Sequence, residues 1–137
     1  MKLSILALAA GLAFASPAIA AETVDMAPPP APFQKVSKLV KLPDFLPGIG
    51  DLYVDPATLP AGPFLAYDRK GKLVSTIYMV PIEDLQKKVP FDNLSAIGGP
   101  VDHVDIYFNA GHPGVEKPHV HFVMWHVPAA DEALVAK

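Results

Sequence analysis

The most constraining feature of this chain is an alternating stretch between Val101 and Val127 that contains every histidine. The five histidines fall within the 24 residues from His103 to His126. Two runs rich in β-branched and aromatic residues flank a segment at 109–117 that contains two glycines and one proline. This arrangement is typical of two strands joined by a turn. The sequence therefore predicts a β-hairpin over 101–127.

Because side chains alternate between the two faces of a strand, the predicted hairpin has a polar face and an apolar face. The polar face carries His103, Asp105, Tyr107, His119 and His121. The apolar face carries Val104, Ile106, Phe108, Val120, Phe122 and Met124. We expect the apolar face to pack into the core, with Ile106, Phe108, Phe122 and Met124 largely buried.

A hairpin that is symmetric about Pro113 pairs Asp105 with His121 and Tyr107 with His119. His103 is then a diagonal neighbour of His121, at roughly 7–8 Å between backbones. His112 lies in the connecting loop, where it can fold over the site or toward solvent. His126 has the opposite parity and is expected on the other face.

The rest of the chain predicts a mainly β fold of the α+β type, formed by residues 33–137 as one domain. Phe64–Val80 contains a second hairpin around Gly71, and we expect Ile77 and Tyr78 from it in the core. Short helices are predicted over 33–42 and 82–89, with a helical or frayed tail at 129–137. The expected architecture is a small antiparallel sheet or barrel-like domain with two hairpins and one or two short helices.

The N-terminus predicts export. Lys2 precedes an apolar run that ends in Ala18-Ile-Ala20, which is typical of a signal peptide over residues 1–20. We expect cleavage after Ala20, a periplasmic or secreted location and no membrane insertion of the mature chain, because the run is too short for a stable span. Residues 21–32, which are rich in proline, are expected to form a flexible arm without a packed partner.

Charge and composition exclude several classes of partner and site. The formal net charge is −3, and removal of Lys2 with the leader makes it −4. This balance argues against nucleic acid and anionic membrane surfaces as partners. The chain has no cysteine, so a metal site can use only His, Asp, Glu or Met. The sequence has no phosphate-binding loop, dinucleotide fingerprint or Gly-x-Ser-x-Gly motif.

The histidine face therefore predicts a site for a divalent transition metal, with Zn²⁺ or Cu²⁺ favoured. The pair His119-x-His121 places two imidazoles side by side on one face of a strand. We expect His103, His119 and His121 as ligands, and His112 as a ligand or gate from the loop. Asp105 is either a fourth ligand or the acceptor that orients His121. The alternative is a polar strand face whose histidines make only hydrogen bonds.

Two other functions stay open at this stage. The first is a small metal-dependent or His/Asp-dependent enzyme, because an oriented imidazole can act as a general base and a metal can activate water. Because the sequence has none of the catalytic motifs named above, we expect a binding protein rather than an enzyme. The second is an oligomeric structural or stress-related protein of the envelope, since partly apolar strands suit edge pairing and self-association.

Several motifs resemble a family of small secreted bacterial domains of unknown function. They are Gly62-Pro-Phe-Leu-Ala-Tyr-Asp68, Pro100-Val-Asp-His-Val-Asp105, Gly111-His-Pro-Gly114 and Pro118-His119. The family includes a Thermus stress-regulon protein described as a β-rich oligomer, and the resemblance spans roughly 46–127. It implies a β-rich fold and an envelope location, and it implies no activity. This chain departs from the family at Asp51-Leu52, where members often have a further histidine, and after Pro118-His119. Members often continue Tyr-Asp-x-His there, whereas this chain reads Val120-His121-Phe122-Val123, so its histidine set is rearranged.

Overall fold

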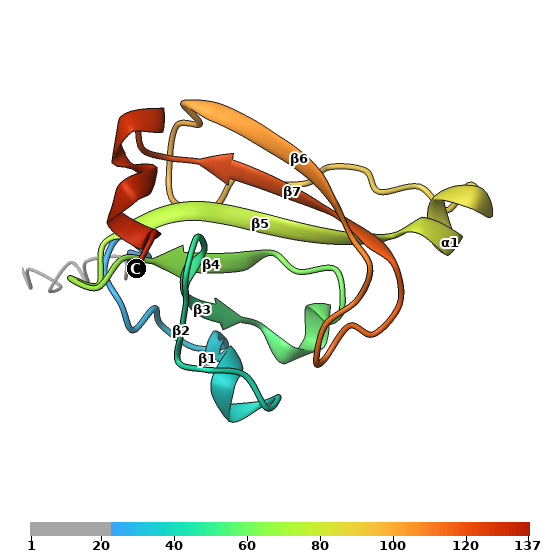
Figure 1. The fold of residues 1–137 in the computed structure, drawn as a ribbon, viewed down its shortest axis with the longest axis horizontal. Helices are drawn as coiled ribbons and strands as arrows, with labels where there is room; N and C mark the ends of the chain where they lie inside the picture. Colours follow the sequence, from blue (N-terminus) through green and yellow to red (C-terminus); the bar gives the residue numbers. More distant parts are fainter. Residues whose placement is uncertain (1–22) are drawn as a thin grey trace, which may run out of the picture.

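The computed structural model describes residues 23–137, which form an open antiparallel sheet of seven strands. Six strands follow the order β1-β3-β4-β5-β7-β6, and β2 pairs with β3 outside this order. Figure 1 shows β6 and β7 at one end of the sheet and β1 and β3 at the other. The strands are β1 (Gln34–Lys35), β2 (Phe45–Leu46), β3 (Gly50–Val54), β4 (Phe64–Tyr67), β5 (Leu73–Pro81), β6 (His103–Asn109) and β7 (His119–Trp125). The predicted small antiparallel sheet is confirmed, and it does not close into a barrel.

Helical structure is short in the described residues. The α-helix α1 spans Ile82–Gln86, inside the predicted range, and three 3-10 helices span Val36–Lys38 (η1), Pro56–Thr58 (η2) and Ala129–Val135 (η3). The helix predicted over 33–42 is wrong, because this stretch forms the short strand β1 and the 3-10 helix η1 instead of an α-helix. Phe33 and Val36 suggested one helical face, but they pack into two different hydrophobic clusters. Their helix-like spacing therefore comes from packing against two separate parts of the core, and not from one face of a helix.

The N-terminal segment that the structure describes contacts the sheet. The Ala27 N–H donates to the Gly71 carbonyl at 2.7 Å, and the Leu73 N–H donates to the Asp25 carbonyl at 2.9 Å. The Tyr67 hydroxyl donates to the Val24 carbonyl at 2.7 Å. The structure thus gives the predicted arm at 21–32 a packed partner that the sequence pattern did not show. The predicted signal peptide at 1–20 lies outside the described residues.

Within residues 23–137, no helix combines the length and the hydrophobicity that crossing a bilayer requires.

Both predicted hairpins form, but the register of the histidine hairpin, β6 with β7, differs from the prediction. Tyr107 pairs with His121, Asn109 with His119, and Asp105 with Val123. The predicted pairs of Asp105 with His121 and Tyr107 with His119 are therefore wrong by two residues. A shift of two leaves every side chain on its predicted face, since the period of a strand is two. The connecting loop, and not the strand pattern, sets this shift.

The assignment of the core face is inverted. On β7, His119 and His121 are 0% and 4% exposed, and Val123 and Trp125 are also buried. On the opposite face of β6, Ile106 and Phe108 are 62% and 63% exposed. Phe122 and Met124 are half-buried, whereas Ile77 and Tyr78 are buried as predicted. The histidine face is therefore the one that contacts the core.

The connections between strands explain this inversion. On the histidine face, Val36 of η1, Leu52 of β3 and Val135 of η3 join one hydrophobic cluster with Val123 and Trp125. On the other face, covering segments are confined to the middle of the sheet. There the Thr76 and Tyr78 hydroxyls donate to the carbonyls of Ile97 and Ser95. The segment that contains Ser95 and Ile97 does not extend over β6. The outward-facing residues of β6, at the edge of the sheet, therefore stay exposed.

A pair of valine substitutions tests this face assignment. Val123 is 4% exposed and Val104 is 49% exposed, on neighbouring strands and opposite faces. Val123→Ala should lower the free energy of unfolding by about 2 kcal/mol, since buried methyl groups are lost and a cavity remains. Val104→Ala should change it by less than about 0.5 kcal/mol. Urea denaturation measures both changes. A larger loss for Val104→Ala than for Val123→Ala would mean that the apolar face predicted from the sequence is the buried one.

Candidate metal centre

Three histidines from β7 and from the β6–β7 loop bring the same ring atom to one point. The Nε2 atoms of His119 and His121 lie 2.8 Å apart, and those of His119 and His112 lie 3.2 Å apart. His119 and His121 are buried on the core face of β7, and His112 is half-buried in the loop. One nitrogen from each ring lies within 4.8 Å of the others, so the three can hold a metal ion together.

Hydrogen bonds at the opposite ring atoms determine which nitrogens carry protons. Nδ1 of His119 donates to the Lys117 carbonyl at 2.7 Å, and Nδ1 of His112 donates to the Pro113 carbonyl at 3.0 Å. A carbonyl can only accept, so both Nδ1 atoms carry a proton, and in the neutral form of each ring Nε2 is then the unprotonated atom. The Nε2 atoms of His112 and His119 then present lone pairs to each other. Two lone pairs at 3.2 Å repel unless a cation or a proton lies between them.

The third ring is held by a side chain. Nδ1 of His121 lies 3.1 Å from the hydroxyl of Tyr107, its cross-strand partner. A tyrosine hydroxyl can donate or accept, so it accommodates either tautomer of His121. Burial, followed by the neighbouring His119 and His112 rings, lowers the pKa of His121 to about 4. The ring is therefore neutral at physiological pH, which is the form that binds metals.

A tight turn holds His112 over the strand. The backbones of His112 and Val115 exchange two hydrogen bonds of 3.0 Å around Pro113-Gly114. Proline followed by a glycine at positive φ is the pair that a type II turn favours, and Gly114 has φ +91°. Gly111, with φ +129°, has no room for a Cβ, which would lie 2.3 Å from the Glu116 carbonyl oxygen. The loop geometry thus depends on glycine at both positions.

The other two predicted site residues, His103 and Asp105, belong to a separate cluster. The two ring nitrogens of His103 contact Asp102 at 2.9 Å and Glu132 at 2.6 Å. Because both partners are carboxylates, both nitrogens donate, and these bonds raise the pKa of His103. Asp105 accepts the indole N–H of Trp125 at 2.8 Å and does not orient His121. Although His103, Asp105 and Glu132 lie close enough for a shared ion, a doubly protonated His103 offers no lone pair.

His126 lies on the opposite face, as its parity predicted. Its Nε2 is 2.8 Å from the Thr76 hydroxyl, and its Nδ1 donates to the Pro100 carbonyl at 2.9 Å. These contacts fix the loop that precedes β6. His126 therefore takes no part in the convergence of the other rings.

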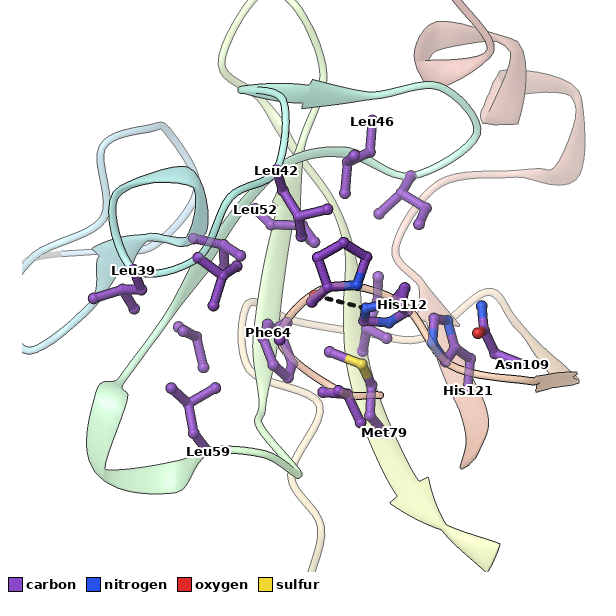
Figure 2. Close-up of a pocket in the computed structure, with 18 of the residues that line it drawn as sticks. Leu39, Leu42, Leu46, Leu52, Leu59, Phe64, Met79, Asn109, His112 and His121 are labelled. Carbon is purple, nitrogen blue, oxygen red and sulfur yellow. Dashed lines mark hydrogen bonds between the residues drawn. The ribbon is translucent and has the colours of Figure 1, made fainter. Parts of the chain in front are cut away.

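An apolar pocket of about 430 Å³ opens beside the three histidines. His112 and His121 form one end of it together with Asn109, and Leu39 and Leu59 lie at the other end (Figure 2). Phe64 and Met79 contribute to the wall between the two ends. Across the described part of the chain, none of the residues that line this pocket is Asp, Glu, Lys or Arg. The pocket therefore combines an apolar body with imidazole groups at one end.

Sequence reasoning did not find several groups that shape the site. Tyr107 lies on the predicted polar face, but its role beside His121 required the true register. The Lys117 and Pro113 carbonyls have no sequence signal, because every residue has such an oxygen. Glu132 is separated from His103 by 29 positions and lies in a tail that no pattern connected with the hairpin.

The fold and the buried histidines define a small antiparallel β-sheet protein with a cluster of imidazoles on its core face. A solved structure with this fold is that of the hypothetical protein TTHB210 from Thermus thermophilus, which is 40% identical, with a TM-score of 0.59. The match covers 69% of this chain and 93% of the Thermus chain. The chain therefore belongs to the family of this Thermus protein. Neither the protein-family models nor the curated proteins contain a match.

The depressed pKa of His121 predicts how the metal-free protein responds to acid. His112, His119 and Tyr107 face this ring, and its pKa is about 4 in place of the ordinary 6.5. As pH falls from 6.5 to 4, the unfolded chain binds a proton that the folded ring does not, so stability is lost in this window. His121→Asn lacks this proton uptake. As pH falls through the window, its free energy of unfolding should therefore rise relative to that of wild type, and above the window the difference between the two should not depend on pH. Denaturant titrations with a chelator present measure this difference, and a constant difference from about pH 7 to about pH 4 would contradict it.

Proposed function

We propose that the protein binds a divalent transition metal, Zn²⁺ or Cu²⁺, through Nε2 of His112, His119 and His121. The observation that carries this proposal is the convergence of three Nε2 atoms, each on a ring whose Nδ1 already has a hydrogen-bond partner. An imidazole held by a carbonyl at Nδ1 is the usual state of a metal ligand, because that bond fixes the tautomer and raises the basicity of Nε2. Two of the three rings have this arrangement.

The spacing of the nitrogens supports the same conclusion. Bonds of about 2.0–2.1 Å to a tetrahedral ion place neighbouring ligand nitrogens about 3.3 Å apart. The distances of 3.2 Å and 2.8 Å need only a small separation of the rings to reach this value. Three protein ligands also leave a fourth position, as in zinc sites that bind water or substrate.

The proposed ligand set is smaller than the one predicted from the sequence, because it leaves out His103 and Asp105. His103 is held between two carboxylates, and Asp105 is occupied by Trp125. We therefore assign them to the support of the β6 edge and the η3 tail. We also propose that the chain acts after export, in the periplasm or outside the cell, on the basis of the signal-like sequence at 1–20.

Calorimetric titration of Zn²⁺ and Cu²⁺ into tag-free protein tests the proposal. His119→Ala and His121→Ala should each weaken binding by more than about 100-fold, since the loss of an outer hydrogen-bond partner alone costs about 10–100-fold. His112→Ala, which removes the loop ligand, should weaken it by at least about 10-fold. The matched control is His103→Ala, which should leave the affinity within about twofold.

A different pattern would contradict the proposed site. If His103→Ala abolished binding while His119→Ala did not change it, the ion would lie in the carboxylate cluster. If the wild-type protein took up neither metal, the three rings would be held by a shared proton, and the proposed function would be wrong.

A further inference from the structure

The pocket beside the three histidines suggests what the fourth position of the metal receives. We propose, building on the metal centre above, that this pocket binds a small amphipathic carboxylic acid, with its carboxylate on the metal and its hydrocarbon chain in the pocket. Imidazoles line one end of the pocket and leucines the other (Figure 2). A ligand that matches this polarity has one polar head and one apolar tail.

Charge selects an anion as the head. Three neutral imidazoles leave the full double positive charge on a bound divalent ion. In the described residues, no acidic side chain lines the pocket to neutralise it. A charge in an apolar environment is stable only when it is paired. A carboxylate oxygen supplies that negative charge and is also an accepted zinc ligand.

Asn109 gives the head a second contact. It lies beside His121 at the polar end of the pocket (Figure 2). Its Oδ1 accepts the Gly111 N–H at 2.9 Å, which leaves the side-chain NH₂ as the group that can donate. A carboxylate has a second oxygen that can accept from this amide, whereas an alcohol or a thiolate has none.

Volume and lining select a hydrocarbon tail. A pocket of about 430 Å³ is within the usual range of about 300–1,000 Å³ for small-ligand sites. Leu39 and Leu59 at the far end are 36% and 43% exposed, so a chain that reaches them removes apolar surface from water. Each buried methylene should strengthen binding by about fourfold.

Cobalt-substituted protein provides the test, because the visible spectrum of Co²⁺ reports a new ligand on the metal. Acetate, butanoate, hexanoate, octanoate and 1-octanol are titrated into the Co²⁺ form of the mature chain. We expect each acid to change the spectrum, and octanoate to bind at least about 100-fold more tightly than acetate. We expect 1-octanol to bind weakly and to leave the spectrum unchanged.

Two variants separate the tail from the head. Leu59→Gln and Leu39→Gln alter the end of the pocket farthest from the histidines, at positions that are partly exposed. Each should weaken octanoate several-fold and leave acetate and Co²⁺ binding unchanged. Leu94→Gln, an exposed leucine outside the pocket, is the matched control and should change neither acid.

The outcomes distinguish this inference from the proposed function. If Co²⁺ binds but acetate and octanoate bind equally, the inference is overturned and the metal site stands. If 1-octanol binds as tightly as octanoate, or if octanoate binds without a spectral change, the pocket acts without the metal and the inference is again overturned. If Co²⁺, Zn²⁺ and Cu²⁺ all fail to bind, the proposed function falls and the inference falls with it.

Discussion

Two backbone carbonyls determine the chemistry of the histidine cluster. The Lys117 and Pro113 oxygens accept the Nδ1 protons of His119 and His112, and this leaves their Nε2 lone pairs directed at each other within 3.2 Å. Two lone pairs this close repel each other, and the metal in our proposal would remove that repulsion by binding both. The loop depends on the same bonds, because the turn at Pro113-Gly114 carries both the His112 ring and the carbonyl that orients it.

Burial of the cluster follows from where the covering segments lie. η1, β2 and η3 all pack on the face of the sheet that carries His119 and His121, and none of them packs on the outer face of β6. Figure 1 shows η3 beside the β6–β7 end and β2 in front of β3 and β4. His119 and His121 consequently lie buried in the core, at 0% and 4% exposure. The pocket forms because η1 and β2 pack over this face of the sheet and the β6–β7 loop brings His112 to one end of it.

The sequence predicted the antiparallel sheet, both hairpins, α1 and the faces of His103, His119, His121 and His126, because alternation with period two is a strong local signal. It did not predict which face is buried, since that depends on segments such as η3 that are distant in the chain. The apolar run of Ile106 and Phe108 favoured the wrong face. The register was wrong by two, because loop geometry at Gly111 and Gly114 fixes it. His103 lies apart from the others because the true register places it opposite Trp125, where Asp102 and Glu132 hold its ring.

The central claim is that one metal ion lies between the three Nε2 atoms. Anomalous diffraction at the zinc absorption edge, from crystals of tag-free protein grown with Zn²⁺, tests this claim most directly. We expect a single strong peak about 2.0–2.1 Å from Nε2 of His112, His119 and His121. A peak between His103 and Glu132 with none at the three histidines, or no peak in zinc-grown crystals, would contradict it.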